Sequence, residues 1–215
     1  MSMISKHSSF LPATYHYELL RTLQSFNFPW YYHRDSTYSI DAGSPNSLED
    51  YKKSWNTTST ELLERSGAKS TFGMAHVFFG PSQSPSNYWN LIRPMMYFIE
   101  DALGIECMEN IIRCKASLLF KDGGGDTFNT PHVDHVEESK YINILYYLNE
   151  SDGDTVFFNE YFNGDLPERV TVKERSSPFE NGLVAFDGHQ YHASSNPINF
   201  RDRITLNWTI KTEGE

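Results

Sequence analysis

The amino-acid sequence predicts a mainly β fold, an antiparallel sandwich or barrel, in its second half. After residue 106, about eight short segments carry the apolar or alternating pattern of strands. Turn sequences such as Asp152-Gly153 and Asn181-Gly182 separate these segments. Helical spacing of apolar residues is confined to the first half of the chain. Short strands at regular spacing favour a sandwich or barrel over alternating helices and strands.

The expected strands differ in character between their two faces. They cover residues 111–120, 141–149, 155–159, 169–173, 182–187 and 203–211, with shorter extended pieces around His132 and His192. The last strand places Arg203, Thr205, Asn207 and Thr209 on one face and Ile204, Leu206, Trp208 and Ile210 on the other. Helices from the first half could cover the apolar face. The polar face either lines a barrel lumen or meets water, and the pattern alone leaves both open.

The first half predicts helices and loops. Pro12 opens a helical segment that carries Tyr15, Leu19, Leu20 and Leu23 at helical spacing. The run Trp30-Tyr31-Tyr32 is expected to pack into the core. Residues 37–67 carry a weak, polar signal. A second helix is expected within residues 88–103, either beginning near Pro94 or kinked there.

Length and charge limit the classes of protein. A chain of 215 residues is expected to form a single domain over residues 1–215 without needing disulfides or a structural metal. The net charge of -10 and the absence of a Lys/Arg run argue against nucleic acid as a partner. Cys107 and Cys114 match no zinc or redox spacing, and no signal-peptide-like or membrane-spanning apolar run occurs. We therefore expect a cytoplasmic protein without a membrane partner.

Three side chains suggest a metal site. His132 and Asp134 are two residues apart in an extended segment, so both point to one face, whereas His135 points to the other. A His-x-Asp triplet alone is weak evidence, and a surface pair is the plainer interpretation. His192 follows an expected strand and the turn at Asp187-Gly188. Two imidazoles and one carboxylate leave three coordination positions open, the facial arrangement of non-haem Fe(II).

Five segments in this order resemble the 2-oxoglutarate- and Fe(II)-dependent oxygenase superfamily. The resemblance is greatest to its prolyl 4-hydroxylase-like branch, in particular the small single-domain members of marine bacteria and phages. The segments are Pro131-His132-Val133-Asp134, Ile144-Leu145-Tyr146-Tyr147-Leu148-Asn149, Gly153-Asp154-Thr155-Val156-Phe157, Val184-Ala185-Phe186-Asp187-Gly188 with His192, and Arg203-Ile204-Thr205-Leu206-Asn207. The resemblance covers about residues 106–211, which would form the catalytic core behind an N-terminal elaboration of residues 1–105.

The resemblance implies a fold and a set of site residues. The fold is a double-stranded β-helix (jelly-roll) with N-terminal helices packed on one sheet. His132, Asp134 and His192 would be the catalytic iron ligands. Arg203 would bind the distal carboxylate of 2-oxoglutarate, which a guanidinium matches with two hydrogen bonds, and Tyr147 would add a hydroxyl donor.

Several details of co-substrate binding stay open. Arg201 is a rival to Arg203. Phe120 stands roughly where some relatives carry a tyrosine, and the polar strand residues Arg113, Lys115 and Ser117 would compensate for it. The loop from Lys121 to Thr130 contains three glycines and is either a lid over the site or a solvent-exposed hairpin.

The resemblance implies a dioxygenase that converts 2-oxoglutarate to succinate while hydroxylating a peptidyl proline, an amino acid or a small metabolite. Fe(II), 2-oxoglutarate and dioxygen would be required, with ascorbate as a candidate supporting reductant. The main alternative is a non-catalytic, cupin-like β-barrel that binds a metal or ligand. A zinc hydrolase ranks below it, because no motif places a general-base Glu beside His132. Metal-dependent succinate formation distinguishes the oxygenase from the binding protein.

Overall fold

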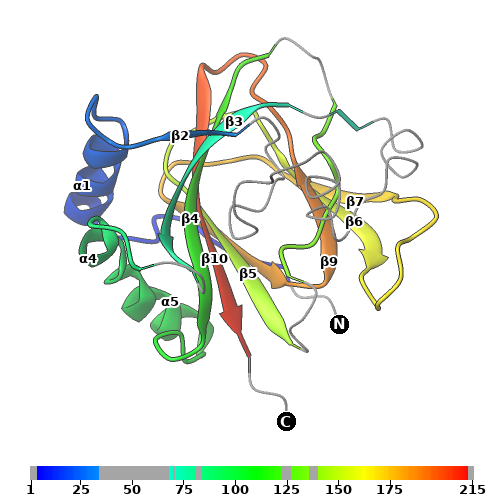
Figure 1. The fold of residues 1–215 in the computed structure, drawn as a ribbon, viewed down its shortest axis with the longest axis horizontal. Helices are drawn as coiled ribbons and strands as arrows, with labels where there is room; N and C mark the ends of the chain where they lie inside the picture. Colours follow the sequence, from blue (N-terminus) through cyan, green and yellow to red (C-terminus); the bar gives the residue numbers. More distant parts are fainter. Residues whose placement is uncertain are drawn as a thin grey trace.

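Two antiparallel sheets form the centre of the protein (Figure 1). The computed structural model describes residues 4–33, 68–69, 71–80, 84–122, 127–135 and 140–212. The large sheet has the order β1 (Ser5–His7), β8 (Gly182–Asp187), β5 (Tyr141–Tyr147), β10 (Asp202–Lys211), β4 (Ile111–Phe120), β3 (Gly73–Phe79), β2 (Tyr31–His33). The small sheet has the order β7 (Val172–Ser176), β6 (Thr155–Tyr161), β9 (Gln190–Ser194).

The chain alternates between the two sheets as a jelly-roll requires. After β4 in the large sheet, the segment around His132 forms an antiparallel bridge with His192 and so lies beside β9 of the small sheet. The chain then returns to the large sheet for β5, passes to the small sheet for β6 and β7, and alternates again through β8, β9 and β10. The expected double-stranded β-helix over a mainly β chain is confirmed.

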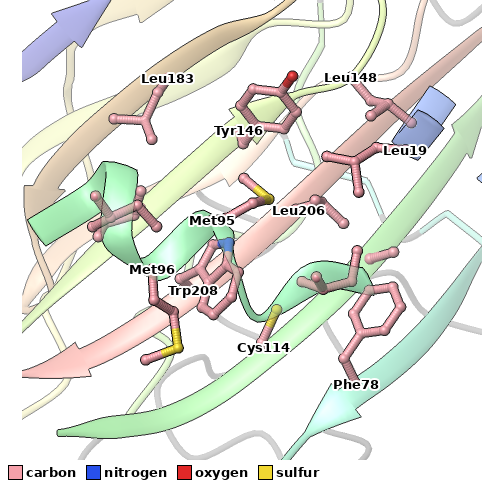
Figure 2. Packing of buried hydrophobic residues seen from close by; sticks show 14 of the residues in the cluster. Leu19, Phe78, Met95, Met96, Cys114, Tyr146, Leu148, Leu183, Leu206 and Trp208 are labelled. Atoms are coloured by element: carbon pink, nitrogen blue, oxygen red, sulfur yellow. The ribbon is translucent and has the colours of Figure 1, made fainter. Parts of the chain in front are cut away.

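The helices cover the outer face of the large sheet (Figure 1). They are α1 (Ala13–Leu23), α4 (Trp89–Ile92) and α5 (Met95–Leu103). Figure 2 shows Leu19 of α1 and Met95 and Met96 of α5 packed over Leu206 and Trp208 of β10. Burying apolar surface between helices and sheet is the main source of stability for such a layer. The apolar strand faces are therefore covered by the N-terminal helices, as the sequence pattern predicts.

Pro94 separates two helices. It has no N–H to donate and its ring disfavours a continuous helix. The helix α4 ends at Ile92, and α5 begins at Met95 directly after Pro94. The helix α5 then ends at Leu103, and the next residue, Gly104, caps it with a φ of 65°, a left-handed conformation that glycine adopts without strain. None of the helices in the described part of the chain is both long and apolar enough to cross a bilayer.

The expectation that the first half holds only helices and loops was wrong. It also supplies β1, β2 and β3 to the large sheet. Tyr31 and Tyr32, expected in the core, are 61% and 64% exposed, because β2 is the edge strand and has a partner on one side only. Trp30 does pack against the core. The weak segment at residues 37–67 lies outside the described residues.

The polar face of β10 lies inside the jelly-roll. Its four polar side chains are all buried, with exposed fractions of 6% or less: Arg203, Thr205, Asn207 and Thr209. The neighbouring strands β4 and β5 place Lys115 and Leu145 directly opposite Asn207. The alternation in β10 therefore separates a helix-covered apolar face from a polar lumen, and the solvent-facing alternative was wrong.

Candidate metal centre

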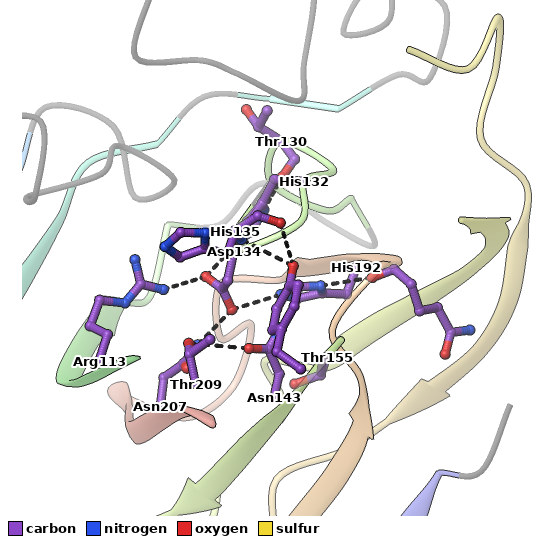
Figure 3. Close-up of polar contacts among 12 residues, drawn as sticks. Arg113, Thr130, His132, Asp134, His135, Asn143, Thr155, His192, Asn207 and Thr209 are labelled. Carbon is purple, nitrogen blue, oxygen red and sulfur yellow. Dashed lines mark hydrogen bonds and ion pairs between the residues drawn. The ribbon is translucent and has the colours of Figure 1, made fainter. Parts of the chain in front are cut away.

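His132, Asp134 and His192 converge between the two sheets (Figure 3). The backbone N–H of His132 donates to the carbonyl of His192 at 2.9 Å, and the reverse bond measures 3.0 Å. This pairing sets the two imidazoles side by side, with ring centroids 4.6 Å apart. One ligand atom from each of the three residues lies within 4.8 Å of the other two. His135 is not part of this cluster, as the strand alternation predicts.

Both imidazoles have the tautomer that metal binding needs. Nδ1 of His132 lies 2.9 Å from the carbonyl oxygen of Thr130, and Nδ1 of His192 lies 3.1 Å from that of Gln190. A carbonyl oxygen only accepts, so each Nδ1 carries the hydrogen and donates it. In the neutral ring, a hydrogen on Nδ1 leaves the lone pair on Nε2. These two Nε2 atoms face Asp134, at 4.0 Å and 3.6 Å from its carboxylate oxygens.

The charges at the site suit a cation. Burial raises the pKa of Asp134, but the Arg113 guanidinium opposes burial, and this pKa is held well below its usual range. Burial and the neighbouring His192 lower the pKa of His132 to about 3. Asp134 is therefore ionised and His132 neutral at physiological pH. These are the protonation states in which a carboxylate and an imidazole bind a metal ion.

A cavity with both polar and apolar lining residues lies beside the two histidines. It is lined by Lys115, Ser117, Leu119, His132, Leu145, Thr155, His192, Ala193, Ser194, Arg203, Thr205 and Asn207. Arg203 is 3% exposed, and its Nη2 donates to Oγ1 of Thr155 at 2.8 Å. The Tyr147 hydroxyl lies 2.8 Å from the same oxygen. No carboxylate of the described residues forms an ion pair with Arg203, so this end of the cavity is suited to an anion.

Arg203, and not its rival Arg201, faces the cavity. Arg201 is exposed and precedes β10, whereas Arg203 is buried and lines the cavity. Phe120 packs against the helix-covered core, and its neighbour Leu119 lines the cavity instead. Neighbouring residues of a strand point to opposite faces, so Phe120 points away from the cavity and Leu119 points toward it.

The other polar residues of β4 divide between two places. Lys115 and Ser117 line the cavity, as expected of compensating polar groups, while Arg113 is paired with Asp134. Residues 123–126 of the glycine-rich loop lie outside the described residues, so its expected role as a lid stays a prediction.

Sequence reasoning missed two contributors. Thr155 joins Arg203 to Tyr147, although the sequence analysis gave this residue no role within its motif. Asn207 donates from Nδ2 to Oδ2 of Asp134 at 3.2 Å. The only sequence signal for Asn207 is its place on the polar face of β10, because its partner is 73 residues away.

No protein-family model and no curated protein matches the chain. Solved structures do. SnoN, a non-haem α-ketoglutarate-dependent epimerase from nogalamycin biosynthesis, matches with a TM-score of 0.57 and 9% identity over 98% of this chain and 79% of that chain. A prolyl hydroxylase from Trichoplax adhaerens, in complex with a hypoxia-inducible-factor peptide, matches with a TM-score of 0.52 and 12% identity over 97% and 83% of the two chains.

These likenesses concern the fold. This chain shares its jelly-roll with SnoN and with the Trichoplax prolyl hydroxylase, which confirms the architecture expected from the sequence. A structure of SnoN with Fe3+, α-ketoglutarate and nogalamycin RO has a TM-score of 0.56 and 9% identity over 98% of this chain and 79% of that chain.

Proposed function

We propose that this protein is an Fe(II)- and 2-oxoglutarate-dependent dioxygenase of the prolyl 4-hydroxylase-like kind. It would hydroxylate a peptidyl proline, an amino acid or a small metabolite and decarboxylate 2-oxoglutarate to succinate. His132, Asp134 and His192 would hold the iron, and Arg203 with Tyr147 would bind the distal carboxylate of 2-oxoglutarate. The observation that carries the proposal is the pair of histidines whose Nδ1–H groups are bonded to backbone carbonyls while both Nε2 atoms face one ionised carboxylate.

The donor set fits iron(II). Two nitrogens and one carboxylate oxygen that approach from one side leave the opposite positions free for other ligands. A structural zinc site would instead need a closed, four-ligand shell, whereas the cluster of possible ligands among the described residues has three members. When bound, the iron would supply the redox chemistry that activates dioxygen together with a 2-oxo acid.

The chain's own residues bind and orient the co-substrate. Arg203 is buried with its guanidinium fixed by Thr155, so it meets a carboxylate without first losing side-chain freedom. Tyr147 keeps its proton, because burial raises the pKa of its hydroxyl and outweighs the lowering effect of Arg203. Its hydroxyl can therefore donate. The apolar side chains of Leu119 and Leu145 also line the cavity and limit water beside them.

The test uses the full chain with Fe(II) and 2-oxoglutarate. Under anaerobic conditions, the expected result is the visible charge-transfer absorption of an iron–2-oxo acid chelate. On admission of oxygen, succinate should form in proportion to iron. His132→Ala should abolish both signals, and His189→Ala, which changes a histidine outside the cluster, should preserve both.

The outcomes separate the alternatives. Binding of metal and 2-oxoglutarate without succinate, even with a panel of prolyl peptides and amino acids, would favour the cupin-like binding protein. An intact, folded chain that binds neither iron nor 2-oxoglutarate would overturn the proposal altogether. Incorporation of oxygen from dioxygen into one member of the panel would identify the hydroxylated substrate.

A further inference from the structure

Both oxygens of the Asp134 carboxylate are engaged by side chains of the large sheet (Figure 3). Arg113 Nη2 donates to Oδ1 at 2.7 Å, and Asn207 Nδ2 donates to Oδ2 at 3.2 Å. The side chains of Arg113 and Asp134 are 6% and 3% exposed. Arg113 comes from β4 and Asn207 from β10, and these strands are hydrogen-bonded neighbours.

The two contacts differ in strength. The bond from Arg113 is short and joins opposite charges out of water, which makes it the stronger kind of hydrogen bond. The bond from Asn207 is longer and comes from a neutral amide. Oδ1 therefore forms the strong hydrogen bond with the guanidinium. Oδ2 lies 3.6 Å from Nε2 of His192, whereas Oδ1 lies 4.0 Å from Nε2 of His132.

This difference matters for how many positions on a metal ion stay free. A carboxylate can bind a cation through one oxygen or through both. With one oxygen, the three residues occupy three positions, and a 2-oxo acid that binds through two atoms still leaves a position for dioxygen. With both oxygens, the carboxylate would take one of the positions that these small molecules need.

We propose that Arg113 is a positioning residue that occupies Oδ1 and so restricts Asp134 to a single metal-binding oxygen, Oδ2, which the weaker bond from Asn207 helps to orient. This role rests on the function proposed above. It differs from the role expected from the sequence, in which Arg113 would help to bind the co-substrate. Arg113 acts through Asp134 and does not itself touch the co-substrate. The strand pairing of β4 with β10 holds both donors in place before any ligand binds.

The test compares Arg113→Met, Arg113→Lys and Asn207→Ser with Thr209→Val. Met fills the space of the Arg side chain without a donor, and Lys keeps the charge but loses the planar fork. Ser is too short to reach Asp134. Thr209 is the matched control, because it lies opposite Arg113 on β10 and its hydroxyl donates to Asn143 at 3.3 Å rather than to Asp134. Thermal unfolding of each variant establishes that it is folded.

Two readouts besides activity are used. Co(II) is loaded in place of iron, and its visible absorption reports the number and arrangement of its ligands. The affinity of 2-oxoglutarate for the Co(II) protein is then measured by titration. Arg113→Met should change the Co(II) spectrum and weaken 2-oxoglutarate binding about tenfold, the scale on which partners of metal ligands act. Lys and Ser should give smaller changes in the same direction, and Thr209→Val none.

Each result has one meaning. If Arg113→Met binds Co(II) with the unaltered spectrum and the unaltered 2-oxoglutarate affinity, the positioning role is overturned while the proposed function stands. If Arg113→Met does not fold, Arg113→Lys and Asn207→Ser decide, and two unaltered spectra and affinities overturn the role. If the unsubstituted chain binds neither Co(II) nor 2-oxoglutarate, the proposed function itself fails.

Discussion

His132 and His192 lie directly opposite each other, and each donates its backbone N–H to the carbonyl of the other. The two imidazoles are thus placed by backbone pairing between segments 60 residues apart, as well as by side-chain contacts. Because the Nδ1 bonds also go to backbone carbonyls, at Thr130 and Gln190, the direction of each Nε2 depends on main-chain geometry. Such fixed outer bonds orient a ligand and set its tautomer before a metal arrives.

The first prediction concerns the ligand itself. His192→Ala removes one of the three converging atoms, so the Mn(II) affinity should fall by more than the roughly 10–100-fold typical of losing an outer partner. Calorimetric titration with Mn(II) measures the change. His189→Ala is the matched control on the turn before β9, and its Mn(II) affinity should equal that of the unsubstituted protein. Equal affinities for both variants would contradict the assignment of His192.

Arg203 and Arg201 give opposite predictions. Arg203→Met removes a buried guanidinium, and hydrogen bonds to charged groups contribute about 1.5–3 kcal/mol. The dissociation constant of 2-oxoglutarate should therefore rise about 10- to 100-fold, as measured by titration of the metal-loaded protein. Arg201→Met changes an exposed residue before β10 and should leave this constant unaltered. A larger effect at Arg201 would reverse the assignment.

Gly153 packs closely against Ser195 and against Arg203, the residue at the anion-binding end of the cavity. A Cβ at this position would lie 2.6 Å from the carbonyl oxygen of Ser195 and 3.0 Å from Cδ of Arg203. Gly153→Ala should therefore destabilise the fold by about 1–3 kcal/mol, the usual range for overpacking. It should also weaken 2-oxoglutarate binding, because Arg203 must shift. Urea unfolding and co-substrate titration check the two effects, and unchanged values in both would contradict them.

The fourth prediction is that the Asp152 carboxylate makes the stability of the fold depend on pH at acidic values. Slight burial raises its pKa, but hydrogen bonds from Asn199, Ile198 and Phe200 outweigh burial and lower it. A carboxylate with a lowered pKa in the folded state stabilises the protein above its unfolded pKa of about 3.9, and the contribution is lost as pH falls through the folded pKa. Asp152→Asn should thus lower the melting temperature at neutral pH.

The difference between Asp152→Asn and the unsubstituted protein should shrink as the pH falls below about 3.9. Melting curves over this range at constant ionic strength provide the measurement. A difference that stays constant down to the lowest pH would show that the charge of Asp152 contributes nothing to stability.

The fifth prediction concerns the helical layer. Leu19 of α1 is fully buried against the large sheet, so Leu19→Ala should lower the free energy of unfolding by about 2–5 kcal/mol. Tyr17 lies on the same helix but is 61% exposed, and Tyr17→Ala should change this free energy by no more than about 0.5 kcal/mol. Urea unfolding of both variants measures the contrast. Similar losses at the two positions would contradict the packing shown in Figure 2.

The sequence predicted those parts of the fold whose residues alternate or recur locally. The strands β4 and β8 have the expected bounds, and β10 begins one residue before its expected start. The strand β3 was missed because Ala75 through Phe78 are all buried, so its two faces do not differ in polarity. The strands β1 and β2 are three residues long and exist only through their partners.

In the candidate site, too, the sequence predicted the residues placed by local geometry and missed the contacts made by the tertiary fold. His132 and Asp134 share a face through local geometry, so the sequence could suggest them. The face to which Phe120 points depends on register, and a shift of one residue reverses it. The ion pair of Arg113 with Asp134 joins residues 21 positions apart on separate elements, and only the assembled sheets bring them together.

The central place of β10 has a consequence for how the protein is made. This strand lies between β4 and β5, whose own residues are translated long before it. Until residues 202–211 have left the ribosome, those two strands lack their shared neighbour, and Arg203 cannot meet Thr155. Pairings between distant parts of a chain form slowly. A nascent chain that stops before β10 therefore contains both histidines but lacks Arg203, Thr205 and Asn207, which line the cavity beside them.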